Sequence, residues 1–145
     1  MIVKFKRLSE DAVMPQKAHP TDAGFDLVAS EATTIPANSR ALIPTDIAMA
    51  IPVGYYGMVV GRSGNTIKRG LVGMTGVIDA GYRNGIGIMA FNLTNEDIVI
   101  NQGERAGQIV IIPILDCSLG EVAELGASER EGGFGSTGGY GSTGA

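Results

Sequence analysis

The chain has 145 residues, of which 44% are hydrophobic, and its formal net charge is -4. This length fits one domain with its own core, and the apolar content argues against disorder throughout. The acidic balance and the lack of a long basic run argue against a general nucleic-acid binder, which has to neutralise many phosphates. A single cysteine, Cys117, excludes an internal disulfide and a thiolate metal cluster.

Neither an export signal nor a membrane span is expected. The basic residues of positions 1–7 are followed by no apolar stretch, unlike a secretion signal. The longest apolar run, residues 109–115, contains Pro113 and is far too short to span a bilayer. The sequence therefore predicts a soluble, cytoplasmic protein without a membrane partner, in which Cys117 is reduced and partly buried.

Short β-branched segments separated by Gly, Pro, Asn or Asp fill most of the chain. The expected strands are residues 2–5, 25–29, 41–44, 56–60, 86–92, 98–100 and 108–112. Since the connections are too short to hold a helix between each pair, the pattern favours an antiparallel sandwich or barrel over a parallel α/β sheet.

One segment interrupts the β pattern. Residues 63–70 predict a helix of one or two turns, with Ser63 or Asn65 as the cap at its start. The basic pair Lys68 and Arg69 lies in the expected last turn, and Gly70 follows as the stop.

The C-terminal end differs in composition, so we expect a β domain over residues 1–127 and a flexible arm over 128–145. Residues 132–138 read GGFGSTG and are echoed by GGYGSTG at 138–144. Such a stretch cannot offset its own ordering entropy and could be only a solubilising tail. The aromatic Phe134 instead favours an arm that orders over a ligand, with the second repeat redundant.

The first candidate site is Gly61-Arg62-Ser63-Gly64. An arginine fork, a hydroxyl and free N–H groups meet where a helical turn begins, and all three favour phosphate. The alternative is an ordinary strand-to-helix turn with a solvated arginine.

The second candidate site lies at residues 76–83. Strand residues run into Asp79, then a glycine turn, then Tyr82. A carboxylate at the mouth of such a hairpin can orient and deprotonate a water, and the ring could stack on a base or sugar. The alternative is a plain hairpin with a turn-favouring Asp.

Three further positions stand out less. Asp26, among apolar residues, suggests a buried, paired carboxylate. Residues 103–108, ending in Gln108, read alone as a turn into an edge strand with charged gatekeepers. His19 is the only histidine, and we expect it on a surface loop.

The order of these motifs is more informative than any one of them. Residues 23–27, 62–64, 76–83, 103–108 and 132–138 resemble the five ordered motifs of the trimeric dUTP pyrophosphatase family, and the resemblance covers about residues 3–138. It implies a distorted β jelly roll that forms a homotrimer, with active sites between subunits. The implied reaction is hydrolysis of dUTP to dUMP and pyrophosphate, which keeps uracil out of DNA and supplies dUMP for dTMP synthesis.

The resemblance also implies a role for each motif. Asp79 is the general base that activates a water, and Tyr82 packs under the deoxyribose. The main chain of residues 73–78 reads the uracil edge. Phosphates are held by the helix-start motif and by the strand glutamine. The implied substrate-binding residues are Arg62, Ser63, Gly64, Gly73, Val77, Ile78, Asp79, Tyr82, Gln108, Arg130, Phe134, Gly135, Ser136 and Thr137, and the implied catalytic residues are Asp79, Arg62, Ser63 and Gln108.

The implied cofactor is Mg²⁺, gripped mainly by the three phosphates and by waters. Asp26 then acts through water and not as a direct ligand, which suits a metal that dehydrates reluctantly. Two positions in the motifs implied to bind phosphate depart from the family pattern. Gly61 replaces the usual proline, which predicts a less rigid phosphate loop. Arg130, the implied ligand of the γ-phosphate, lies one residue closer to the glycines than usual.

Two other functions on this fold are alternatives, and the sequence argues against the first. A dCTP deaminase shares the fold but needs a carboxylate on the strand after the hairpin, and residues 86–91 contain no acid. A nucleotide-gated regulatory protein on the same fold, with a protein partner, is the alternative from another class.

Overall fold

The computed structural model describes residues 1–134 and 137, and these residues are mostly β with one short helix. The elements in chain order are β1 (Lys4–Arg7), β2 (Phe25–Val28), β3 (Thr33–Ile35), β4 (Arg40–Pro44), β5 (Ile47–Ala50), β6 (Tyr55–Val60), α1 (Ser63–Arg69), β7 (Leu71–Gly73), β8 (Gly76–Ile78), β9 (Gly87–Asn92), β10 (Ile98–Ile100) and β11 (Arg105–Pro113). The expectation of an all-β chain with one short helix is confirmed.

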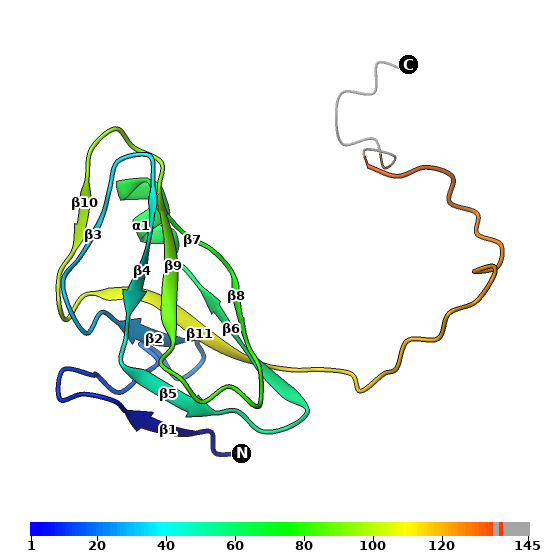
Figure 1. Cartoon of the computed structure of the whole chain (residues 1–145), viewed down its shortest axis with the longest axis horizontal. Coiled ribbons are helices and arrows are strands. Elements are labelled where there is room, and N and C mark those ends of the chain that lie inside the picture. Colours follow the sequence, from blue (N-terminus) through cyan, green and yellow to red (C-terminus); the bar gives the residue numbers. More distant parts are fainter. Residues whose placement is uncertain (135–136, 138–145) are drawn as a thin grey trace.

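Every strand pairing in the described chain is antiparallel. The largest sheet has the order β2-β11-β6-β8, and a second has the order β4-β9-β7. Two strand pairs, β1-β5 and β10-β3, extend the body at its two ends (Figure 1). Helix α1 packs beside β7, so it lies near the point where the two larger sheets approach each other.

An aliphatic core lies between these sheets and follows the alternation of a strand. Along β9, Ile88 and Ala90 point inward while Met89 points outward. They meet inward-facing side chains of the other strands, among them Leu27, Ile43, Val59 and Ile109. Burial of each such side chain contributes about 1.5–3 kcal/mol. The core therefore fits the antiparallel sandwich that the strand pattern predicts and the distorted jelly roll that the family resemblance implies.

One buried polar residue organises the turn after β9. The Asn92 amide donates to the carbonyl oxygens of Ile35 (2.9 Å) and Glu96 (2.7 Å). Its own oxygen accepts from the Thr94 backbone N–H (2.9 Å) and hydroxyl (2.7 Å). Because all of these groups are paired, the buried amide costs little and fixes the turn that leads to β10.

The structure corrects the sequence prediction at several places. Strands β3, β5 and β7 were not expected, because two of them have only three residues and β5 is buried at consecutive positions. Helix α1 begins at Ser63 with Arg62 at the N-cap position and no side-chain cap, so the expected cap by Ser63 or Asn65 is wrong. Gly70 ends the helix in the left-handed conformation, as expected (φ 69°).

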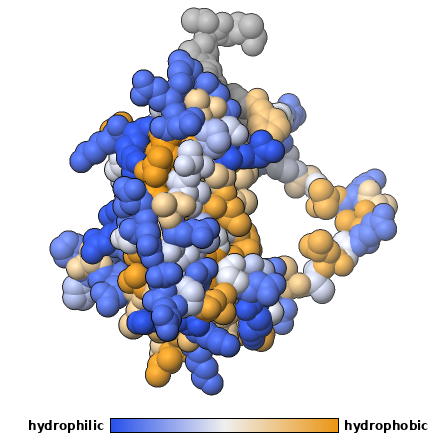
Figure 2. All heavy atoms as spheres, turned by 60° about the vertical axis from the view of Figure 1, so that its left-hand side comes forward, coloured by the Kyte–Doolittle hydropathy of each residue, from blue (hydrophilic) through white to orange (hydrophobic). Residues whose placement is uncertain are grey.

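The chain leaves the body after Ile114, whose N–H donates to the Gly54 carbonyl (2.9 Å). The following residues extend away from the sheets (Figure 1), and Figure 2 shows apolar side chains uncovered along them. Leu119 and Leu125 are almost fully exposed. Cys117 is also exposed there, contrary to expectation. The domain boundary at residue 127 stays a prediction.

No helix of the described residues is long and apolar enough to cross a membrane.

Candidate active site

A hollow of about 550 Å³ lies where β2, α1 and β11 meet. Five of the residues expected to bind phosphate or to face the metal lie in its wall, together with side chains from the loop before β2 and from the rest of α1. Its lining comprises Ala18, Asp22, Gly24, Asp26, Arg62, Ser63, Gly64, Asn65, Lys68, Arg69 and Gln108. One chain therefore brings together Asp26, Arg62, Ser63, Gly64 and Gln108.

The register of the central strand explains this meeting. Gln108 of β11 pairs with Asp26 of β2 on one side and with Val60 of β6 on the other. Since Arg62 follows β6 by two residues, the end of β6 delivers it to the same edge. Strand pairing alone thus places an amide, a carboxylate and a guanidinium around one hollow.

Asp26 lies between two guanidinium groups. Its Oδ1 is 3.7 Å from Nε of Arg62, and its Oδ2 is 3.6 Å from an Nη of Arg105. The Arg62 guanidinium also donates to the Arg105 carbonyl oxygen at 3.5 Å. The expected pairing of Asp26 is confirmed, although its side chain is 18% exposed and so only partly buried. With Arg62 40% exposed, the pair orients the guanidinium more than it stabilises the fold.

The first turn of α1 presents polar groups to the hollow. Ser63 and Gly64 are exposed, and the N-cap residue Arg62 supplies no side-chain cap. Its carbonyl oxygen accepts from the N–H groups of Asn65 (3.1 Å) and Thr66 (3.3 Å). The N–H groups at a helix start have no partner within the helix, so those of Ser63 and Gly64 can bind an anion.

Gln108 is held in place by two glycines. Its amide donates to the Gly61 carbonyl oxygen at 3.3 Å, and a Cβ at Gly24 would overlap its Oε1. Gly61 in turn crosses Gly73 so closely that a Cβ at Gly61 would lie 2.7 Å from the Gly73 nitrogen. This packing leaves no room for a side chain at position 61, and the less rigid phosphate loop stays a prediction.

The residues expected to read the base form a separate group on β7, β8 and the turn that follows. Val77 and Asp79 are exposed, Gly73 and Ile78 are half-buried, and none of them lines the hollow. Tyr82 also lies outside the hollow, and its backbone N–H donates to the Asp79 carbonyl oxygen at 3.0 Å. Its hydroxyl donates to the Gly85 carbonyl oxygen at 3.0 Å, which holds the ring at the turn.

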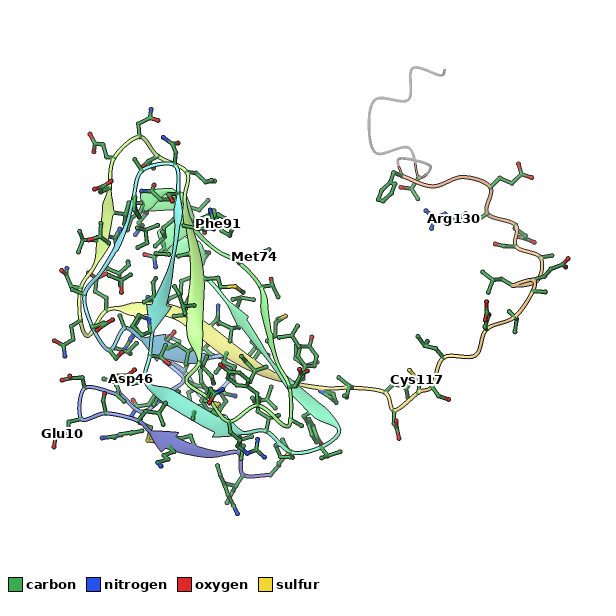
Figure 3. The ribbon with its side chains drawn as sticks, in the orientation of Figure 1. Glu10, Asp46, Met74, Phe91, Cys117 and Arg130 are labelled. Atoms are coloured by element: carbon green, nitrogen blue, oxygen red, sulfur yellow. The ribbon has the colours of Figure 1, made fainter. Side chains whose placement is uncertain are left out.

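The C-terminal residues form a third group. Arg130, Phe134 and Thr137 line a small hollow of their own with Gly133, and Phe134 is fully exposed. Arg130 lies far from the β body in Figure 3. Gly135 and Ser136 lie outside the described residues, as does the second glycine-rich repeat. On one chain, the expected site residues therefore occupy three separate places.

His19 is exposed in the loop before β2, as expected, and its backbone N–H donates to Asp22 Oδ2 at 2.9 Å.

Sequence reasoning missed several residues of the hollow. Asp22, Asn65, Lys68 and Arg69 line it, although the basic pair had been assigned only to the last helical turn. Lys68 follows Gly64, and Arg69 follows Asn65, by four positions, which places each pair on one face of a helix. This four-residue spacing is the sequence signal from which Lys68 and Arg69 could have been assigned to the hollow.

The comparison with known families decides the assignment. The dUTPase family model matches residues 10–138, which include the hollow and the hairpin with Asp79. The chain belongs to the dUTPase family. A relative in Oryza sativa subsp. japonica, named deoxyuridine 5'-triphosphate nucleotidohydrolase, is 41% identical over 94% of this chain and 80% of its own length.

Solved dUTPase structures agree with this fold. The dUTPase of Staphylococcus bacteriophage 80alpha with dUpNHpp superposes with a TM-score of 0.87 at 36% identity, covering 93% of this chain and 97% of that one. That phage dUTPase is described as controlling the transfer of virulence genes. A mutant dUTPase from phage phi11 of S. aureus has a TM-score of 0.82 at 34% identity, covering 86% and 99% of the chains, and coordinates a structural Mg(II) ion.

Proposed function

We propose that this dUTPase-family chain is a dUTP pyrophosphatase that hydrolyses dUTP to dUMP and pyrophosphate. The observation that carries the proposal is the hollow in which Arg62, Ser63 and Gln108 converge beside unpaired helix-start N–H groups. Guanidinium, hydroxyl and N–H donors are the groups that bind phosphate best. The relatives' nucleotidohydrolase activity supports dUTP as the substrate.

The hollow binds the triphosphate. Arg62 is held by Asp26 and by the Arg105 carbonyl, so its guanidinium is oriented before the substrate arrives. Ser63, Gly64 and Gln108 supply further donors to the α- and β-phosphates. Donors that are fixed in advance stabilise the charge of the transition state without reorganising.

Asp79 acts as the general base. Its side chain is exposed at the end of β8 and has no hydrogen-bond partner among the described residues. It takes a proton from a water whose oxygen bonds to the α-phosphorus, and the bond from that phosphorus to the bridging oxygen breaks as pyrophosphate leaves. Tyr82 packs against the deoxyribose, while the main chain near Gly73, Val77 and Ile78 reads the uracil.

A complete site requires several copies of the chain. The hollow, the hairpin of Asp79 and the C-terminal residues are separate on one chain, and each carries part of the expected chemistry. We infer a homotrimer in which the hollow of one copy faces the hairpin of a second. The C-terminal arm of a third closes over the nucleotide with Arg130, Phe134 and Thr137, and with Gly135 and Ser136, which lie outside the described residues.

The donors of the hollow fit a hydrated Mg²⁺ bound mainly through phosphate. Both oxygens of Asp26 face guanidinium groups, so this carboxylate is better placed to accept a hydrogen bond from a metal-bound water than to bind the ion. The described residues contain no group of three His, Cys, Asp or Glu side chains that could hold a metal. When bound, Mg²⁺ offsets the charge that develops on the leaving pyrophosphate.

The alternative, a nucleotide-gated regulatory protein on the same fold, is not favoured over hydrolysis, although the phage 80alpha dUTPases control the transfer of virulence genes. A dCTP deaminase is disfavoured, since residues 86–91 carry no acid. We expect the enzyme to act in the cytoplasm.

Pyrophosphate release from dUTP, dCTP, dTTP and UTP, each with and without Mg²⁺, tests the proposal. The expected result is Mg²⁺-dependent release from dUTP alone. Tight binding of dUTP without release from any of the four would overturn the enzymatic proposal and favour a nucleotide-gated regulator.

A further inference from the structure

Helix α1 needs an anchor, because its own sequence and packing supply little. It has seven residues, and none of them is buried. A helix this short is marginal in water without tertiary contacts. Since Arg62 and Ser63 stand at its start, any shift of α1 moves two of the residues expected to bind phosphate.

The anchor is at the other end of the helix. Arg69 places one Nη at 3.2 Å from Glu104 Oε2 and donates through the other to the Val99 carbonyl oxygen at 2.8 Å. Glu104 lies in the turn between β10 and β11, and Val99 lies in β10, just before that turn. Because a planar guanidinium is bound here at two nitrogens, the contact fixes the orientation of the Arg69 side chain as well as its distance from the turn.

Glu104 is itself held firmly. Its Oε1 accepts from the backbone N–H of Asn101 (3.0 Å) and from the Asn101 amide (2.8 Å). The Asn101 backbone N–H has the largest effect and lowers the pKa of Glu104 below its ordinary value of 4.5. Burial opposes this shift, while the Asn101 amide and the Arg69 guanidinium lower the pKa further. The lowered pKa keeps the carboxylate ionised at neutral pH, and the two Asn101 contacts orient it toward Arg69.

The same turn is attached to the strand of Asp26. The Ala29 N–H donates to the Glu104 carbonyl oxygen at 2.8 Å, and the Gly103 N–H donates to the Ala29 carbonyl oxygen at 2.9 Å. Arg105, the next residue, accepts from Arg62 through its carbonyl oxygen. Both ends of α1 thus contact residues 99–105. Gly103 and Glu104 of this segment are hydrogen-bonded to Ala29, the residue after β2.

We propose that Arg69 is a positioning residue for the phosphate site: with Glu104 it fixes α1 so that Arg62 and Ser63 stay aligned with Gln108 across the hollow. This inference rests on the proposed function, since it concerns the same site. Arg69 also lines the hollow, but both of its terminal nitrogens are engaged by the turn, so it acts through α1 and not on the substrate.

Neighbouring residues offer matched controls. Lys68 lines the same hollow and has no interaction partner among the described residues, so Lys68→Met removes one positive charge and leaves the Arg69–Glu104 pair intact. Glu104→Ala does the reverse, because it breaks the pair and makes the region more positive. If charge alone mattered, Glu104→Ala would tighten the binding of a triphosphate.

The experiment measures KM and kcat for dUTP and Kd for dUpNHpp in Arg69→Met, Glu104→Ala, Lys68→Met and the Arg69→Met/Glu104→Ala double variant. We expect both single variants of the pair to raise KM and Kd by about three- to tenfold, a modest change because each partner is one third exposed. The change in kcat is smaller, and the double variant is no worse than either single one.

Three results would overturn the inference: tighter binding in Glu104→Ala, an equal loss in Arg69→Met and Lys68→Met, or a lower melting temperature with unchanged KM and Kd. The last would make the pair structural only. If Arg69→Met does not fold, Glu104→Ala and Arg69→Lys decide, with an intermediate Kd expected for the lysine. If the wild-type protein binds dUpNHpp but does not hydrolyse dUTP, the proposed function fails, while the Kd values still decide the role of Arg69.

Discussion

The phosphate hollow and the hairpin of Asp79 are built in opposite ways. The hollow is assembled within one chain by strand register, by close glycine contacts and by ion pairs around Asp26. The hairpin holds Asp79 and Tyr82 at an exposed turn whose hydrogen bonds are local. In the proposed function, a single chain thus forms the anion-binding half of the site in advance and leaves uncovered the half that we propose to read the base and activate water.

The largest expected effect concerns the hairpin. Asp79→Asn keeps the shape of the turn but removes the base, so turnover of dUTP should fall by about 10²–10⁴-fold. Binding of dUpNHpp should remain, because the hollow is untouched. Steady-state pyrophosphate release and calorimetric Kd values measure the two quantities, and near-normal turnover would refute the role of Asp79.

Next in size is removal of the C-terminal residues. Deletion after Ala127 should abolish most activity and leave the β body folded, because Ile114 makes a backbone hydrogen bond to the body and lies well before the deletion. Deletion after Gly138 is the matched control and should change activity little. Circular dichroism and the pyrophosphate assay separate folding from catalysis, and an unfolded Ala127 truncation would show that the arm is structural.

A pair of glycines compares the packing of the two regions. Gly61→Ala puts a Cβ against the Gly73 backbone and should lower the free energy of unfolding by about 1–3 kcal/mol. Gly81→Ala, in open space at the hairpin, should change it by less than about 0.5 kcal/mol. Urea denaturation measures both, and equal stability of the two variants would contradict the close contact.

The smallest effect is the pH dependence of the Arg69–Glu104 pair. Since the pKa of Glu104 is lowered in the folded protein, its contribution to stability is present above the ordinary value of 4.5 and is lost as the pH falls. The stability difference between wild type and Glu104→Ala should therefore shrink on acidification. Melting curves between neutral and acidic pH test this, with Glu121→Ala as the control. If the stability difference between wild type and Glu104→Ala instead grows on acidification, the prediction is wrong.

The features that could be predicted from the sequence are those that depend on residues close together in the chain. Alternating strands and the Gly70 helix stop are local patterns, and they were found. Strand β5 was missed because Ile47, Ala48 and Met49 are all buried, which hides the two-residue period.

The site shows the same division. The motif order identified Arg62, Ser63, Asp79 and Gln108 as candidates, but their separation into the hollow and the hairpin depends on the fold. That Asp26 contacts Arg105 as well as Arg62 follows from the β2–β11 register, which no local pattern contains. Arg69 was overlooked for the same reason, because its partner Glu104 lies on a distant turn.

Subunit mixing tests most directly the claim that the site is shared. Arg62→Ala disables the hollow and Asp79→Asn disables the hairpin, so each variant alone should be nearly inactive. If the two are co-expressed with different tags and purified through both, each mixed trimer should contain one intact site of three and regain about a third of wild-type activity. A mixture no more active than either variant would place the hollow and hairpin of one chain in the same site and contradict the account.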